Sequence, residues 1–124
     1  MQQIEAGANA ILPEHQDDPH TLHIFMLVKA TRNWLSLKND QRASFMQTEI
    51  GSLLRTRPEV KLRFFDAEAF TTQASDVLLW ETNDMSAWVW LCDHLRDTLF
   101  WDHYFEILQI LPSLEGNYSA ERES

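Results

Sequence analysis

Three short segments of this chain restrict its fold more than any other feature, because they place apolar residues on both sides of a strand. They read IFMLV at residues 24–28, LRFF at residues 62–65 and VLLW at residues 77–80. Their length and β-rich composition predict strands. A sheet with one face in water should alternate apolar and polar residues, so both faces of this sheet need cover.

Two further segments have helical spacing. The first runs from about Asp40 to Arg55, with Asn39 or Asp40 as its N-cap, and Pro58 prevents its continuation. The second begins at a cap formed by Asn83 or Asp84. Its apolar stripe consists of Trp88, Leu91, Leu95 and Leu99.

Strands are predicted at residues 22–30, 60–70, 76–81 and 104–111, and Pro112 is expected to close the last one. The order β-α-β-β-α-β is the ferredoxin-like arrangement, an α+β fold with an antiparallel four-stranded sheet. Two helices cover only one face of that sheet, and a second copy is the economical cover for the other. The sequence therefore predicts a homodimer through the open sheet face, a dimeric α+β barrel. The alternatives are cover by the N-terminal arm or a few exposed apolar residues.

The 124 residues suffice for one domain with a core of its own. Residues 1–20 lack periodicity and are predicted to form a flexible arm, residues 21–118 the domain and residues 119–124 a polar tail. The start of the chain lacks signal-peptide features, and no apolar run approaches the roughly 20 residues of a membrane span. The lone Cys92 excludes an internal disulfide, which fits a cytoplasmic protein. A net charge of −9 argues against binding to nucleic acid or anionic lipid.

Polar side chains stand among aromatic ones where the second helix meets the last strand, in the segment WDHY at residues 101–104. His103 is the natural general base near pH 7, and Asp102 or Glu106 could orient it. The side chains expected to shape a substrate pocket here are Arg96, Trp101 and Tyr104. The alternative is that the aromatic residues are core, His103 is an exposed loop residue, and Arg96 pairs on the surface with Asp93 or Asp97.

The predicted hairpin between the second and third strands offers a second candidate. If TTQAS centres its turn at Gln73, Asp66 faces Trp80 and Glu68 faces Leu78. The two carboxylates would then lie roughly 6–7 Å apart beside the indole. At that distance they could hold one proton between them for acid–base work. The alternative is an edge-strand end where both carboxylates reach water.

Signatures of several other chemistries are missing from the sequence. It contains no P-loop, no Gly-rich phosphate cradle and no G-x-S-x-G elbow. His20 and His23 are three residues apart, whereas Cys92, His94 and His103 have no recognised ligand spacing. We therefore predict neither a metal site nor a cofactor.

Four segments of the chain carry a resemblance to a known family. They read FMLVKAT.NWL, LRFFDAEAF, SD..LWE..D and LRDTLFWDHYFEILQILPSLEGNY, and they lie within residues 21–118. On them the chain resembles the darcynin family, small bacterial proteins without an assigned function. The resemblance implies the ferredoxin-like fold and supplies no reaction.

A more distant similarity is to the dimeric α+β barrel superfamily. That group includes cofactor-independent monooxygenases, small isomerases, decyclising enzymes and the haem-binding chlorite dismutase relatives. The pattern LR-x-T at Leu95, Arg96 and Thr98 is similar to the last of these. No position can be matched to their haem-ligating histidine, so the similarity leaves haem binding open, and fold alone does not fix function.

Three functions are compatible with these patterns. The first is a cofactor-independent enzyme, monooxygenase- or isomerase-like, that binds an apolar or aromatic substrate between helices and sheet. His103 would be its base, oriented by Asp102 or Asp66, and its pocket would include Trp80 and Glu68. The second is a non-catalytic module that binds a small molecule or another protein. The third is a structural dimer without a ligand.

Overall fold

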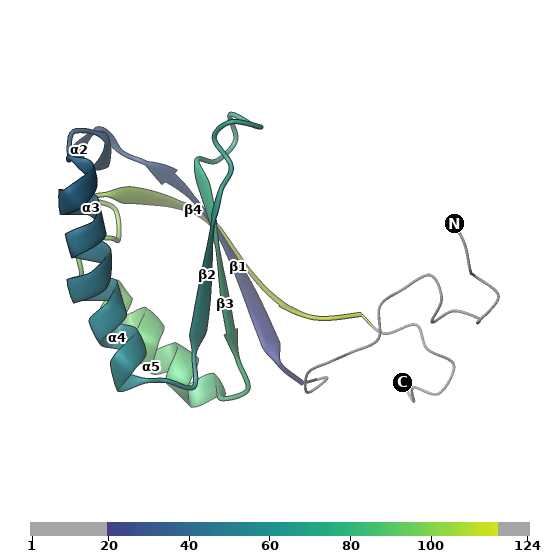
Figure 1. The fold of residues 1–124 in the computed structure, drawn as a ribbon. Helices are drawn as coiled ribbons and strands as arrows, with labels where there is room; N and C mark the ends of the chain where they lie inside the picture. Colours follow the sequence, from purple (N-terminus) through teal and green to yellow (C-terminus); the bar gives the residue numbers. More distant parts are fainter. Residues whose placement is uncertain (1–19, 117–124) are drawn as a thin grey trace, which may run out of the picture.

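The computed structural model describes residues 20–116, which form one sheet with helices on one side (Figure 1). The predicted tail and all of the predicted arm except its last residue lie outside the described residues. In chain order the elements are β1 (Leu22–Ala30), α2 (Arg32–Leu35), α3 (Asn39–Phe45), η2 (Met46–Ile50), α4 (Gly51–Thr56), β2 (Lys61–Asp66), β3 (Asp76–Thr82), α5 (Met85–Leu95) and β4 (Phe105–Leu114).

The sheet has four strands in the order β2-β3-β1-β4, and all three neighbouring pairs are antiparallel. The predicted ferredoxin-like α+β fold is therefore confirmed. In Figure 1 the long helical segment and α5 lie on the same side of the sheet, and the other face has no helix. None of the helices within residues 20–116 combines the length and the apolar character needed to cross a membrane.

The first predicted helix forms as α3, η2 and α4 in succession. It begins one residue before Asp40, and the Gln41 side chain, not a cap at Asn39 or Asp40, accepts the Lys38 N–H at 2.8 Å. The π-helical turn at its centre brings Phe45 and Ile50, five residues apart, into the core together. At α5, the predicted alternatives resolve to Asp84, which accepts the Ala87 N–H.

The last strand differs from its prediction because Pro112 does not end it. The strand starts one residue later than expected and continues to Leu114. Since β4 is an edge strand bonded only to β1, a residue without an N–H can stand in it without breaking an inner ladder. A bulge shifts the β1–β4 register at Leu27 and Val28.

The core lies between the helices and one face of the sheet. The even-numbered residues of β1 and β3 point into it, as alternation along a strand requires. The largest fully buried side chains are Trp80, Phe100, Phe105, Ile24, Met26, Leu78, Leu91, Leu95 and Val28. The odd-numbered residues of the same strands therefore form the face without helices.

Candidate functional site

The helix-free face, called here the open face, is built from cross-strand rows. Leu111, Phe25, Leu79 and Arg63 stand opposite one another across all four strands. Phe25 is 37% exposed and Leu111 is 42% exposed, although both lie on a continuous sheet. The prediction that these strands are apolar on both faces is thus confirmed.

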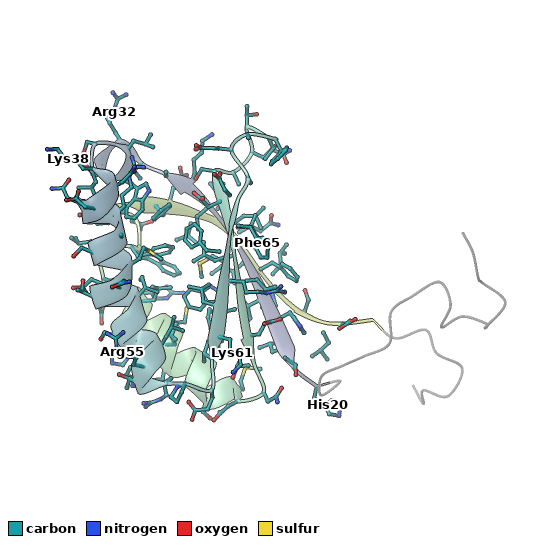
Figure 2. The ribbon with its side chains drawn as sticks, in the orientation of Figure 1. His20, Arg32, Lys38, Arg55, Lys61 and Phe65 are labelled. Atoms are coloured by element: carbon teal, nitrogen blue, oxygen red, sulfur yellow. The ribbon has the colours of Figure 1, made fainter. Side chains whose placement is uncertain are left out.

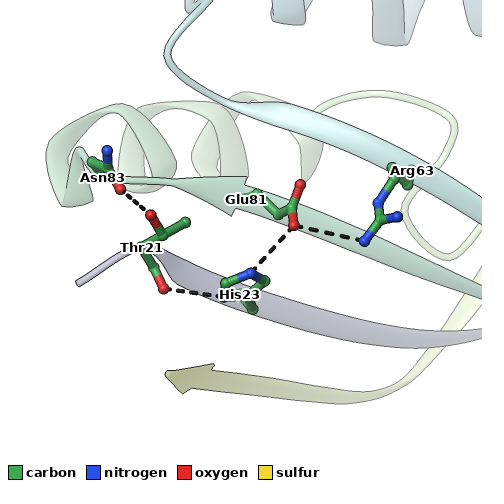
Figure 3. Close-up of polar contacts among 5 residues, drawn as sticks. All are labelled: Thr21, His23, Arg63, Glu81 and Asn83. Atoms are coloured by element: carbon green, nitrogen blue, oxygen red, sulfur yellow. Dashed lines mark hydrogen bonds and ion pairs between the residues drawn. The ribbon is translucent and has the colours of Figure 1, made fainter. Parts of the chain in front are cut away.

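The next row toward the start of β1 is polar. His23 and Glu81 stand directly opposite each other, and His23 Nε2 lies 3.2 Å from Glu81 Oε2 (Figure 3). The Arg63 guanidinium reaches the same oxygen at 3.7 Å. His23 Nδ1 lies 3.0 Å from the Thr21 carbonyl oxygen, so each ring nitrogen faces an acceptor. The imidazole is held from both sides.

A hollow of about 450 Å³ opens where these two rows meet. Its apolar part is formed by Phe25, Phe65, Leu79 and Leu114, and its polar part by His23, Arg63, Ser113 and Glu115. Figure 2 shows Phe65 on the side of the sheet away from the helices. An apolar concavity with a few placed polar groups is the usual form of a small-molecule site.

The residues around His103, the first predicted site, form a turn. The His103 side chain is exposed, and its main-chain oxygen accepts the Thr31 hydroxyl at 2.6 Å. Asp102 has a positive φ of 71°, and its N–H donates to the Phe105 carbonyl at 2.8 Å. Tyr104 packs edge-on against Phe45 at a ring distance of 4.9 Å. These contacts hold the chain as it enters β4.

Arg96 and Trp101 do lie together, as expected for two walls of one pocket. The Arg96 guanidinium carbon stands 4.6 Å from the centre of the Trp101 ring, in a cation–π contact. Arg96 forms no ion pair with Asp93 or Asp97 among the contacts of residues 20–116. The contact links the C-cap of α5 to the segment that leads into β4.

The predicted register of the β2–β3 hairpin is wrong. Asp66 opposes Asp76, not Trp80, and β2 ends there rather than at residue 70. Glu68 does not oppose Leu78, because residues 67–75 form a loop. The Ala67 N–H bonds to Ser75 and starts that loop immediately after the strand. Trp80 is fully buried on the helix side, so its indole does not stand beside the two carboxylates.

Carboxylates nevertheless gather at this end of the sheet, around Asp76. Burial raises the pKa of Asp76 above its ordinary 3.8, a hydrogen bond from the Ser75 hydroxyl lowers it, and the negative charges of Asp66 and Glu68 raise it further. The Ser75 hydroxyl also accepts the Ala30 N–H at 2.7 Å. This group of acids is tied into the end of β1 by that serine.

The sheet separates the two predicted sites. Asp66 ends β2 at one edge, whereas His103 precedes β4 at the other edge, with β3 and β1 between them. Three strand spacings amount to about 14 Å, too far for a direct contact. The structure therefore does not bring His103 and Asp66 together, and their catalytic roles stay predictions.

The described residues do not fit a haem or another metal centre in the core. Residues 20–116 contain no group of three or more His, Cys, Asp or Glu side chains that could hold a metal ion. Of their four histidines, His20, His94 and His103 are exposed, and His23 lies on the open face with contacts at both nitrogens. None of these imidazoles is directed into the helix-covered core.

The contact among His23, Glu81 and Arg63 was missed from the sequence. Alternation could have placed all three on one face, because each is odd-numbered in its predicted strand. Their meeting at one end of the sheet depends on the β1–β3 register, which the sequence pattern does not specify. The sequence could therefore have predicted that these side chains share a face, but not that they contact one another.

The fold and this face define a ferredoxin-like α+β domain with one apolar sheet surface that no helix of residues 20–116 covers. The family model of darcynin, described as a domain of unknown function, matches residues 9–123. The chain belongs to the darcynin family.

Relatives from several bacteria are similar over most of the chain. A darcynin homolog from Granulibacter bethesdensis is 38% identical over 99 residues, which cover 79% of this chain and 80% of the relative. Darcynin 1 from Acinetobacter baumannii is 35% identical over 91 residues, covering 73% of this chain and all of the relative. These similarities agree with the family assignment.

Solved structures with the same fold include chlorite dismutases. One from Candidatus Nitrospira defluvii aligns with a TM-score of 0.66 at 10% identity over 83% of this chain. A dimeric chlorite dismutase from Nitrobacter winogradskyi aligns with a TM-score of 0.57 at 16% identity over 70% of this chain. This chain spans 43% of the first structure and 53% of the second. At such identities the likeness shows the fold alone.

Proposed function

We propose that this protein is a homodimer that packs two open faces together and binds a small apolar molecule between them. The observation that carries the proposal is the open face itself. Its central row exposes Phe25 and Leu111, and a hollow of about 450 Å³ lies beside them. Contiguous apolar surface of this kind marks an interaction site.

The size of the face agrees with a second copy as the occupant. Four strands about 4.8 Å apart and seven paired positions at about 3.3 Å give a plane of roughly 19 by 23 Å, or about 450 Å². Projecting side chains make the accessible surface larger than the plane. Two such faces together therefore approach the roughly 1,000 Å² that a specific interface needs.

Two further considerations support a copy of the same chain. Face-to-face packing of sheets about 10 Å apart is a standard way of burying apolar strands. An isologous pair also covers both uncovered faces at once. One of the structures with the same fold is described as a dimeric chlorite dismutase, which agrees with dimer formation by this fold class.

The open face supports binding better than catalysis. Among the histidines of residues 20–116, His23 is the one that lines the hollow, and it has the Thr21 carbonyl at one ring nitrogen and Glu81 at the other. A general base needs a nitrogen that can reach the substrate proton. We therefore assign His23 to the polar rim of a binding site, and catalysis at His103 stays the alternative.

Light-scattering mass measurement during gel filtration tests the proposal with a matched pair of variants. Leu111→Lys places an ammonium group on the open face, and Leu99→Lys places one in the connection between α5 and β4, where Leu99 is 51% exposed. The wild type and Leu99→Lys should have twice the mass of one chain. Leu111→Lys should weaken the dimer by about tenfold or more, because an unpaired charge is costly to bury.

Two results would contradict the proposal. A wild type that remains a monomer at high micromolar concentration excludes the pairing of open faces. A dimer that dissociates with Leu99→Lys and persists with Leu111→Lys places the interface away from the open face.

A further inference from the structure

We infer that the molecule bound in the hollow is an apolar acid, and that Arg63 binds its carboxylate. This inference rests on the proposed function and names the ligand class of the same site. It depends on the chemistry of three neighbouring side chains, His23, Glu81 and Arg63. An aromatic or branched aliphatic body would fill the apolar part of the hollow.

The apolar part of the hollow suits a ring or a branched chain. Phe25 and Phe65 stand on either side of Leu79, which is 4% exposed. The Phe65 ring also lies 5.5 Å from the Arg63 guanidinium carbon. A flat apolar body placed here would contact two aromatic rings while its polar end lies beside a cation.

Within residues 20–116, no hydrogen bond engages the Arg63 guanidinium, so its donors are available to a ligand. Its contact with Glu81 is 3.7 Å, which is an ion pair but is too long for a hydrogen bond. The Arg63 side chain is 60% exposed. A guanidinium has five N–H donors arranged to receive a carboxylate through two parallel bonds. Arg63 is thus positioned to bind an anion that lies in the hollow.

Glu81 holds one ion pair with Arg63 and has a nearer partner of its own. The same Glu81 oxygen lies 3.2 Å from His23 Nε2, half an ångström closer than the Arg63 nitrogen. His23 in turn is fixed by the Thr21 carbonyl. His23 and Glu81 therefore hold each other, and Glu81 contacts Arg63 through one nitrogen of its guanidinium.

Dimer formation increases the need for an anion at this position. When a second copy covers the open face, Arg63 loses water, and a buried cation without a hydrogen-bonded partner is strongly unfavourable. A ligand carboxylate would satisfy it. The competing source is a carboxylate of the partner copy, such as Glu106, which stands on the open face opposite Lys29.

Calorimetric titration with two matched probes at neutral pH tests the inference. 2-Naphthoate and 2-naphthylmethanol share one aromatic body and differ in the carboxylate. The wild type should bind naphthoate more tightly than the alcohol. Arg63→Gln should weaken naphthoate binding about tenfold, the effect of losing a hydrogen bond to a charged group, and leave the alcohol unchanged. The naphthoate affinity of Arg63→Lys should lie between those of the wild type and Arg63→Gln, because lysine keeps the charge and lacks the planar guanidinium.

The control is Arg55→Gln, since Arg55 projects from α4 on the helix side (Figure 2). It should leave both affinities unchanged. Equal affinity of the wild type for the two probes, absence of binding by both, or an equal loss for both probes in Arg63→Gln would overturn the inference. So would dissociation of the Arg63→Gln dimer, which assigns Arg63 to a carboxylate of the partner copy.

The two proposals fail in different measurements. A monomeric wild type that still prefers naphthoate through Arg63 overturns the dimer and keeps the ligand class. A stable dimer without that preference overturns the ligand class and keeps the dimer.

Discussion

His23 and Glu81 face each other across β1 and β3, and the imidazole Nε2 lies 3.2 Å from the carboxylate Oε2. Both side chains are largely covered, at 16% and 21% exposure, although they stand near the end of the open face. The pair therefore combines a cross-strand contact with a polar boundary for the apolar hollow. It also determines which side of Arg63 is already engaged.

Removing the carboxylate of this pair should reduce stability. Glu81→Ala leaves His23 Nε2 without its acceptor, and we expect a loss of about 1 kcal/mol in the free energy of unfolding. Glu49→Ala, at an exposed helical position, should change it by less than about 0.5 kcal/mol. Urea unfolding of both variants measures the difference. Equal effects would show that the cross-strand contact contributes nothing.

Asp76 should make stability depend on pH. Its pKa is raised above 3.8 in the folded protein, chiefly by burial, so the folded state retains a proton that the unfolded state has already lost. Its contribution to the free energy of unfolding therefore falls as pH rises above 3.8, and the penalty is complete once the folded carboxyl is ionised.

The variant Asp76→Asn removes that penalty and keeps an oxygen for the Ser75 hydroxyl. Urea unfolding at a series of pH values should show Asp76→Asn gaining stability over the wild type as pH increases from about 3.8, the ordinary pKa of Asp76. A difference that stays constant with pH, or that favours the wild type at neutral pH, would contradict the effect of burial.

Substitutions of Asp102 should change the stability of the protein through the backbone conformation and not through loss of the carboxylate. Its φ of 71° is the left-handed region, which costs roughly 1–2 kcal/mol for residues with a Cβ and nothing for glycine. Asp102→Gly should therefore preserve or increase stability, and Asp102→Ala, which keeps the Cβ and removes only the carboxylate, should change it by less than about 0.5 kcal/mol. Thermal unfolding of the two variants separates them. A greater loss with glycine would exclude this structural role.

His103→Ala tests the predicted catalytic base. Because the side chain is exposed and its main-chain oxygen makes the contact with Thr31, we expect unfolding and naphthoate binding to be unchanged. Calorimetric titration with 2-naphthoate measures the binding. A marked loss of affinity in this variant would move the ligand to the turn before β4 and support the enzyme alternative.

The order of elements could be predicted because each has a local signal. Runs such as residues 24–28 and 77–80 are short and rich in β-branched or aromatic residues, which favours strands, and Asp84 caps α5 as its side-chain type suggests. The apolar open face followed from the same runs. Alternation along a strand is a property of the backbone and needs no tertiary information.

Contacts between strands were less predictable. TTQAS suggested a tight turn, but the chain uses residues 67–75 as a loop, and the Asp66–Asp76 pairing follows from its length. Pro112 suggested a strand end because proline has no N–H for a ladder bond. The sheet accommodates this proline because β4 is an edge strand, which depends on the strand order. The pairing of His23 with Glu81 likewise depends on register.

A crystal structure of the full chain grown with 2-naphthoate tests the central claim most directly. The account predicts two copies related by a twofold axis with their open faces together. It also predicts the naphthoate carboxylate at about 2.8 Å from the Arg63 guanidinium. Open faces that lie in solvent, or that are covered by residues 1–19 of the same chain with no naphthoate beside Arg63, would contradict it.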